Sequence, residues 1–246
     1  MKQTKIGIFS DTHGNLLALK AILKYFDEIK VDYIFHLGDV VCMGPRPKEC
    51  MELLLSTKNL TCILGNHDND YLNNNDIPPE LSHVTKEHKR FMFDLMGEEY
   101  RKDVARFPLI VVQNYFGKKV AFMHYGLARE IDKQKNPKAV FRPIDNNTTA
   151  ESLDSMFESV PADIVFFRHK HSAIDLVGKK VYCDVGSAGC YKDSFARCVV
   201  LTINEDGVYD IQRVLVPYDR QAVLKDMDDR QIPSAKFIQD FYFQCD

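Results

Sequence analysis

The chain has 246 residues, 45% hydrophobic and 27% charged, which is the composition of a globular protein rather than a disordered or collagen-like one. Its 32 basic and 35 acidic side chains leave a net charge of −3, so no overall field attracts nucleic acid or an anionic membrane. No apolar run has the length of a membrane span or a signal-peptide core, so we expect neither. The seven cysteines form no CxxC pair and are expected to be reduced thiols in a cytoplasmic protein.

Short apolar runs alternate with amphipathic stretches along residues 4–65. This order of strand, helix, strand, helix and strand predicts βαβ units with a parallel sheet. Each expected strand ends in a polar loop that contains glycine. The expected strands are 6–9, 33–37 and 60–64, and the expected helices are 16–29 and 47–55.

The rest of the chain predicts further strands and three additional helical segments. A polar stretch at about 69–105 is expected to be a helical, cap-like insertion, and 126–148 is expected to be a loop. The later strands predict a second, largely antiparallel sheet. We therefore expect one α/β domain over 1–246, with two stacked mixed sheets flanked by helices in a four-layer α/β/β/α sandwich. The expected strands are 109–112, 120–123, 164–167, 173–177, 181–184, 197–203 and 209–214; the helices are 150–159 and two between 219 and 246.

Polar clusters follow the ends of five predicted strands. In open α/β sheets, ligands bind outside the carboxyl ends of the strands. Residues spaced two apart in extended chain point to the same side, so each D-x-H or H-x-H pair can converge on one point. The clusters are Asp11-Thr12-His13, Gly38-Asp39, Gly65-Asn66-His67-Asp68, His124 and His169-Lys170-His171.

These clusters supply candidate metal ligands. Two carboxylates, one amide and four imidazoles form a mixed oxygen and nitrogen set that suits Mn, Fe, Zn, Co or Ni better than calcium. Seven ligands exceed the needs of one ion and fit two ions that share a bridging carboxylate. Two-metal sites hydrolyse phosphoesters by stabilising both the attacking and the leaving oxygen. The candidate ligands are Asp11, His13, Asp39, Asn66, His124, His169 and His171.

In this order the clusters resemble the pattern D-x-H, G-D, G-N-H-[DE], H and G-H-x-H of the calcineurin-like metallophosphoesterase superfamily. The segments GPRPKEC, GSAG and VPYD further resemble its small bacterial and archaeal, YfcE-like phosphodiesterase branch. The resemblance covers roughly residues 4–219. It supports the four-layer fold and implies a dinuclear-metal phosphoesterase.

The resemblance also implies how the ligands divide between the two ions. Asp39 would bridge them, a hydroxide held between them would be the nucleophile, and Mn²⁺ is the first expectation for the metal, with Fe, Zn, Ni or Co as alternatives. One ion would be held by Asp11, His13, Asp39 and His171, and the other by Asp39, Asn66, His124 and His169.

Two further residues are implied to be catalytic. His67 resembles the family histidine that protonates the leaving oxygen or stabilises the transition state. Asp68 is expected to orient that imidazole and to raise its pKa, as a carboxylate beside a histidine does.

The chain departs from the family pattern at positions that bear on substrate. Arg168 replaces the glycine that usually precedes the H-x-H pair, and its guanidinium could reach a substrate phosphate or point away. The usual N-P-G-S-V-G is D-V-G-S-A-G at 184–189. Lys192 could replace a family arginine as a phosphate contact, although a point charge is less selective than a bidentate fork.

Other polar residues have simpler readings. His36 lies within an apolar strand and is expected to be a hydrogen-bonded core histidine. His83 and His88 belong to the polar insertion and are expected to be solvated. Cys42 could approach the site as a soft ligand or an oxidisable thiol, but a small buried hydrophobe is the better interpretation.

The sequence therefore predicts a metal-dependent phosphoric ester hydrolase, first of all a phosphodiesterase acting on a small phosphodiester or nucleotide. The alternatives are a phosphomonoesterase or protein phosphatase, a dinucleoside polyphosphate hydrolase and, in another class, a non-catalytic protein-binding scaffold of the same fold. The complete ligand set and His67 favour an enzyme. We expect a small phosphorylated substrate, no membrane and no stable nucleic-acid partner; a homo-oligomer is left open.

Overall fold

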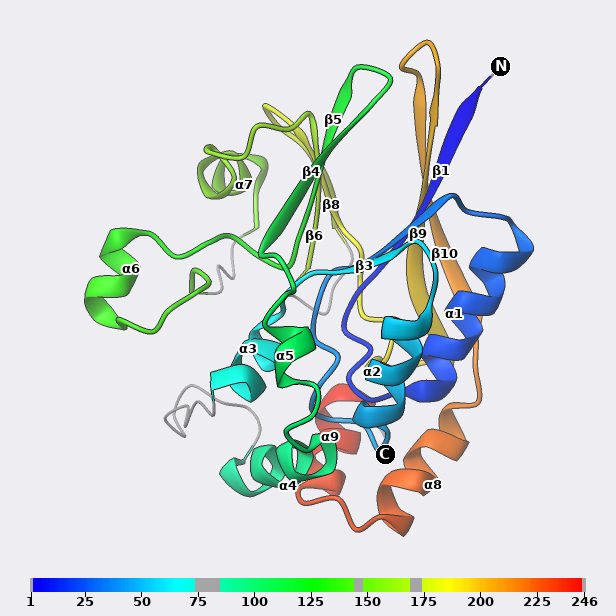
Figure 1. Ribbon diagram of the computed structural model, residues 1–246, viewed down its shortest axis with the longest axis vertical. Coiled ribbons are helices and arrows are strands. Elements are labelled where there is room, and N and C mark those ends of the chain that lie inside the picture. Colours follow the sequence, from blue (N-terminus) through cyan, green and yellow to red (C-terminus); the bar gives the residue numbers. More distant parts are fainter. Residues whose placement is uncertain (1, 74–84, 144–147, 169–173, 245–246) are drawn as a thin grey trace.

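Two five-stranded sheets face each other in the computed structural model, which describes residues 2–73, 85–143, 148–168 and 174–244 (Figure 1). Helices cover the outer faces of both sheets, so the predicted sandwich of two mixed sheets flanked by helices is confirmed. Within those ranges, no helix combines the length and the apolar character needed to cross a bilayer.

The first sheet has the strand order β10-β9-β1-β2-β3. Its N-terminal strands β1, β2 and β3 are parallel, as the βαβ pattern predicts, so their carboxyl ends lie at one edge. Strand β9 is antiparallel to this group and pairs directly with β1, and β10 is in turn antiparallel to β9. The bounds are β1 (Gln3–Phe9), β2 (Tyr33–His36), β3 (Leu60–Cys62), β9 (Phe195–Asn204) and β10 (Tyr209–Pro217).

The second sheet has the order β4-β5-β6-β8-β7. Its central strands β5, β6 and β8 are parallel, and the edge strands β4 and β7 are antiparallel to their neighbours. This sheet is therefore mixed as well. The bounds are β4 (Ile110–Tyr115), β5 (Lys118–Met123), β6 (Ile164–Phe167), β7 (Ile174–Val177) and β8 (Val181–Asp184).

The core between the sheets is aromatic and aliphatic. Phe35 of β2 and Phe122 of β5 stack across it with ring centroids 3.7 Å apart and planes at 2°. Ile6 and Ile8 of β1 belong to the same buried cluster as Ile164 of β6. Burial of a large apolar side chain contributes about 1.5–3 kcal/mol to the stability of the fold. The contact between Phe35 and Phe122 therefore helps to hold β2 against β5.

Helices follow the strands where apolar residues recur at helical spacing. The Asn15 side chain caps the first helix by accepting from the Ala18 N–H at 3.0 Å. Helices α1 and α2 cover the first sheet and α7 covers the second, on opposite sides of Figure 1. The bounds are α1 (Leu16–Glu28), α2 (Pro47–Ser56), α3 (Asn66–Asn73), α4 (Lys86–Met96), α5 (Arg101–Val104), α6 (Glu130–Lys135), α7 (Ala150–Met156), α8 (Arg220–Asp229) and α9 (Ala235–Tyr242).

Two expectations about the later chain are wrong. The last two strands do not extend a second, antiparallel sheet, because β9 is antiparallel to β1 and carries β10 into the first sheet. The stretch 126–148 is not only a loop, because it contains α6, whose first turn is closed by Asp132 accepting from the Arg129 N–H at 2.9 Å. The insertion at about 69–105 contributes parts of α3 and all of α4 and α5, and its role as a cap stays a prediction.

Candidate metal centre

The loops that leave β1 and β2 pack against each other. The Asp11 N–H donates to the Gly38 carbonyl at 2.9 Å, and the His13 N–H donates to the Asp39 carbonyl at 3.0 Å. Asp11, His13 and Asp39 have positive φ values of 52°, 44° and 63°, in the left-handed region that costs a side-chain-bearing residue free energy. Backbone strain at three candidate ligands is typical of a functional site.

Three of the predicted ligands converge. Asp11, Asp39 and His124 each offer a ligand atom, and these atoms all lie within 4.8 Å of one another. All three residues are buried, and they come from the ends of β1, β2 and β5. The two sheets therefore bring together residues that are 113 positions apart in sequence, counted from Asp11 to His124.

The two candidate histidine ligands among the described residues direct the same ring nitrogen toward Asp39. His13 Nδ1 lies 3.3 Å from the Val41 carbonyl, and His124 Nδ1 lies 2.8 Å from the Leu37 carbonyl. A carbonyl only accepts, so in each case the Nδ1–H is the donor and the ring lone pair is on Nε2. The His13 and His124 Nε2 atoms lie 4.0 and 3.5 Å from Asp39 Oδ2, which places this oxygen near both rings.

Asn66 adds an oxygen at the same point. Its Oδ1 lies 2.9 Å from His124 Nε2, although both atoms are acceptors when His124 donates through Nδ1. Burial lowers the pKa of His124 to about 4, so the ring is neutral near pH 7. An amide oxygen and an imidazole nitrogen that are directed at the same point can both bind a divalent cation, and the residues present therefore suit the implied metal.

Asp39 is a buried carboxylate that lies near other carboxylates. Burial raises its pKa well above the ordinary value, and the nearby charges of Asp11 and Asp68 raise it further. Gly65 is needed beside it, because a Cβ at that position would lie 2.2 Å from Asp39 Oδ1. A cation in the centre would relieve the repulsion among these carboxylates.

Asp68 has contacts that differ from the expected pairing with the His67 imidazole. Its Oδ2 accepts from the N–H groups of Asp39 and Gly65 at 2.8 and 3.2 Å. Its Oδ1 accepts from Val40 and Val41 at 2.9 and 3.2 Å. The carboxylate thus holds in place the loop after β2, which carries the candidate ligand Asp39. Burial raises the pKa of Asp68 despite these four hydrogen bonds, and its effect on the imidazole of His67 stays a prediction.

His67 lies beside the converging ligands. Its N–H donates to Asp39 Oδ1 at 2.9 Å, and its ring meets the His13 ring edge to face with centroids 5.3 Å apart. The residue is partly exposed, unlike the buried His13. Its predicted catalytic role stays a prediction.

Arg168 is the largest fully buried side chain in the described part of the chain. Its Nε donates to Asp11 Oδ2 at 2.7 Å and its Nη1 donates to Asp184 Oδ1 at 3.2 Å. The suggestion that its guanidinium reaches substrate is therefore wrong for this structure, because the group has no exposed surface and is held between two carboxylates. Lys192 is exposed, and its contact with a substrate phosphate stays a prediction.

His169 and His171 lie outside the described residues, so their expected roles as ligands stay predictions. The same applies to His83. Two other expectations are confirmed: His36 is buried and accepts from the Gly38 N–H at 3.3 Å through Nδ1, and Cys42 is fully buried.

The expectation that His88 is solvated is wrong. It is fully buried in α4, where its Nε2 accepts from the Met43 N–H at 3.0 Å and its Nδ1–H donates to the Pro233 carbonyl at 2.8 Å. The neighbouring Lys89 is also buried and donates to Asp70 of α3 at 2.8 Å. Sequence reasoning missed both, although the spacing of His88 with Met92 at i,i+4 indicates a shared buried face.

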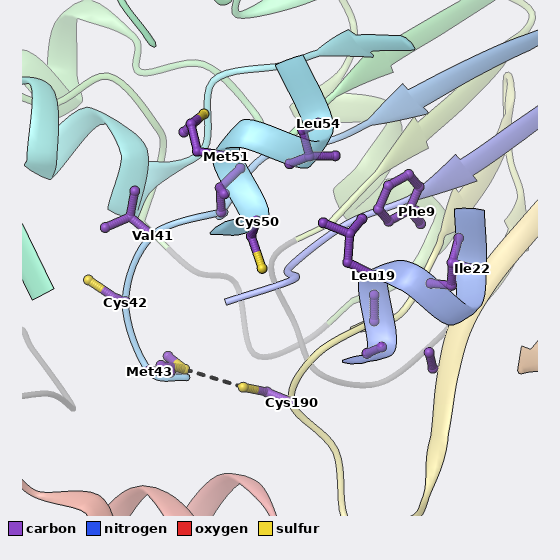
Figure 2. Packing of buried hydrophobic residues seen from close by; sticks show 14 of the residues in the cluster. Phe9, Leu19, Ile22, Val41, Cys42, Met43, Cys50, Met51, Leu54 and Cys190 are labelled. Atoms are coloured by element: carbon purple, nitrogen blue, oxygen red, sulfur yellow. Dashed lines mark hydrogen bonds between the residues drawn. The ribbon is translucent and has the colours of Figure 1, made fainter. Parts of the chain in front are cut away.

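The segment after Asp39 is shaped by strained backbone and sulfur packing. Cys42 and Met43 have φ values of 77° and 66°. Figure 2 shows this segment against α2, with Met43 Sδ facing Cys190 Sγ at 3.8 Å. Burial raises the pKa of the Cys42 thiol, so it remains protonated and packs as a hydrophobe.

The loops that follow strands of the two facing sheets thus bring buried carboxylates and imidazoles together, an arrangement that suits a metal centre. The calcineurin-like phosphoesterase family model matches residues 4–197, and the chain belongs to this family. It is accordingly a hydrolase of phosphoric esters.

Individual relatives support the same fold over nearly the whole chain. An uncharacterized protein of Methanocaldococcus jannaschii is 27% identical over 254 residues, covering 95% of this chain and 96% of the relative. A hypothetical protein of Pyrococcus horikoshii has a similar structure, with a TM-score of 0.75, 18% identity and coverage of 97% and 98%. A metallophosphoesterase of Sphaerobacter thermophilus also has a similar structure, with a TM-score of 0.71 and 21% identity. The match covers 96% of this chain and 97% of the other.

Proposed function

We propose that the chain is a dinuclear-metal phosphodiesterase that acts on a small phosphodiester or nucleotide. The observation that carries the proposal is the convergence of Asp11, Asp39 and His124, whose ligand atoms lie within 4.8 Å of one another in a buried site. Family membership supplies the reaction class, and the resemblance of the sequence to the phosphodiesterase-like branch favours a diester.

The ligand set would divide between two ions as the family pattern implies, and Asp39 would be the bridging carboxylate. Its Oδ2 faces the Nε2 atoms of both His13 and His124, which supports this role. Two divalent ions, when bound, supply Lewis-acid activation of water and neutralise charge on the phosphoryl oxygens. We include His169 and His171, outside the described residues, as the remaining ligands. Mn²⁺ is the metal proposed first.

His67 has a separate task from the ligands. Its partly exposed ring lies next to His13 and is proposed to protonate the leaving oxygen or to stabilise the charge that develops in the transition state. The Asp39 Oδ1 atom holds the His67 backbone N–H at 2.9 Å, which couples the position of the acid to that of the bridging ligand.

The test is hydrolysis of bis-p-nitrophenyl phosphate and p-nitrophenyl phosphate by metal-stripped protein reconstituted with Mn²⁺. We expect metal-dependent release and a higher kcat/KM for the diester. Asp39→Asn should lower kcat/KM at least about 1,000-fold, which corresponds to about 4 kcal/mol. Asp27→Asn makes the same chemical change at an exposed site in α1 and should leave the rate unchanged.

Other outcomes identify the alternatives. Preference for the monoester would favour a phosphatase. No hydrolysis of either model substrate, with two ions bound per chain, would favour an enzyme specific for a dinucleoside polyphosphate or another nucleotide. Those compounds would be tested next. Silence there as well would favour the protein-binding scaffold. Failure of the wild-type chain to bind any divalent ion would overturn the proposal.

A further inference from the structure

The side chain of Arg168 connects the two sheets at the metal centre. It begins just after β6 of the second sheet, where its backbone N–H donates to the carbonyl of the candidate ligand His124 at 2.8 Å. Its Nε reaches Asp11, at the end of β1 in the first sheet, at 2.7 Å. One residue therefore contacts a ligand-bearing residue from each sheet.

The Asp11 carboxylate is fixed by donors on both of its oxygens. Ser10 Oγ donates to Oδ1 at 2.9 Å, and Arg168 Nε donates to Oδ2. Each carboxylate oxygen has more than one lone-pair site, so both remain able to bind a cation. Two donors on different oxygens define the plane of the carboxylate and thus the direction of its remaining lone pairs.

Asp184 in turn holds Arg168. Its Oδ1 accepts from Arg168 Nη1 at 3.2 Å and from the Gly186 N–H at 3.0 Å. Arg168 and Asp184 together carry no net charge, but burial lowers the pKa of His13 and His124, and the Arg168 charge, the nearer one, lowers it further. A nearby cation does not itself attract a metal ion, so what the pair offers the centre is the orientation of Asp11.

Fold stability alone does not explain this residue. Arg168 is fully buried, and its Nη2 has no hydrogen-bond partner in the described part of the chain. A buried cationic donor that lacks a partner costs free energy, and apolar side chains of similar volume are often at least as stabilising as a buried ion pair. The arrangement is thus better explained by what it does to Asp11.

We infer that Arg168 is a positioning residue that orients the Asp11 carboxylate toward the metal centre and thereby strengthens binding of the ion that Asp11 holds. The inference rests on the proposed function, because it assumes the two-ion centre. Partners that orient a ligand typically change metal affinity by about 10- to 100-fold when they are mutated.

The experiment compares metal affinity with folding in variants that keep the buried charge balanced. The double variant Arg168→Met/Asp184→Asn removes both charges while keeping similar volumes. Mn²⁺ dissociation constants are measured by competition with a metallochromic chelator, and bound metal is counted by elemental analysis. Thermal unfolding of the metal-free protein reports the fold.

We expect the double variant to unfold near the wild-type temperature, while one of its two ions binds at least about tenfold more weakly and the other is unchanged. Arg168→Lys keeps a charge but loses the fork, so its affinity should lie between those of the wild type and the double variant. Arg46→Met/Asp226→Asn is the matched control, because it removes a two-point guanidinium–carboxylate contact, with bonds of 2.6 and 2.7 Å, outside the centre. Both ions should bind this control as in the wild type.

The contrary outcomes are distinct. Wild-type affinity for both ions in a folded double variant would overturn the positioning role and leave the two-ion centre standing. Equal weakening of both ions together with a large loss of thermal stability would also overturn it, because it would assign Arg168 to the fold. A wild-type chain that binds no divalent ion would overturn the inference and the proposed function together.

Discussion

The two sheets contribute to the metal centre in different ways. The loops of the first sheet place Asp11, His13 and Asp39 by left-handed backbone and by hydrogen bonds between neighbouring loops. The second sheet contributes His124, whose orientation depends on a hydrogen bond to the Leu37 carbonyl in the first. One half is therefore shaped by its own backbone, and the other is aligned by contacts that cross between the sheets.

Local and long-range contacts therefore contribute to the centre in different ways. Local backbone geometry determines which atoms point into the centre, and the stacked Phe35 and Phe122 determine whether the two halves meet. Arg168 contributes in both ways, because it extends from the second sheet and its Nε donates to Asp11 in the first. Substitutions can then be ranked by which of these connections they break.

The largest expected effect is on turnover. His67→Ala should lower kcat about 100- to 10,000-fold, because a positioned acid contributes that much, while both ions stay bound. The measurement is kcat together with metal content after dialysis. His67→Gln is the companion variant, which keeps a polar side chain without a titrating proton. Loss of metal in His67→Ala would instead make His67 a ligand.

Asp68→Asn should destabilise the loops of the first sheet that carry the candidate ligands. Its carboxylate accepts four backbone N–H groups, and an amide keeps only one acceptor oxygen. We expect the free energy of unfolding of the metal-free protein to fall by about 3–5 kcal/mol. Urea unfolding measures it, with Asp94→Asn at an exposed position of α4 as the control.

The opposite pattern for Asp68→Asn would support a different role. Unchanged unfolding with a loss of turnover would indicate that the carboxylate acts on the His67 imidazole, as the family pattern suggests. The four backbone hydrogen bonds to Asp68 favour the effect on stability.

Much of the part of the candidate site that belongs to the first sheet could be predicted from the sequence, because each strand and its candidate ligands are close together along the chain. Each apolar run of β1, β2 and β3 is followed at once by its polar cluster, so strand ends and ligands could be read together. The fold class followed from the same alternation. The position of β9 could not be predicted, because its pairing with β1 joins residues nearly 200 positions apart.

The role of Arg168 also could not be read from its neighbours in sequence. Its two carboxylate partners, Asp11 and Asp184, are separated from it by 157 and 16 positions. A single arginine beside a predicted histidine pair suggests a phosphate contact as readily as an ion pair. Only the three-dimensional arrangement shows that the guanidinium is buried.

The pH dependence of stability tests the connection between α4 and the loop after β2. Burial lowers the pKa of His88 to about 4, and the nearby charges of His13 and Lys89 act in the same direction. The unfolded chain then binds the proton more readily than the folded chain, so stability falls as the pH drops from about 6.5 toward 4.

His88→Gln should reduce this loss. Between pH 7 and 4.5 the wild type should lose about 2–3 kcal/mol more unfolding free energy than the variant. Urea unfolding at both pH values measures the difference, and the other buried histidines contribute to both proteins alike. Identical pH dependence in the two proteins would show that His88 is protonated without disturbing its contacts with Met43 and Pro233.

The smallest expected effect concerns the exposed loop after β8. Lys192→Ala should raise KM for the diester about threefold and leave kcat unchanged, since an exposed cation adds uniform binding to an anionic substrate. Lys179→Ala, exposed in the turn between β7 and β8, is the matched control. An unchanged KM in Lys192→Ala would show that Lys192 does not contribute to substrate binding, and the metal centre alone would then balance the charge of the substrate. A lower kcat would mean that this lysine acts on the transition state, and the second sheet would then supply catalytic as well as aligning residues.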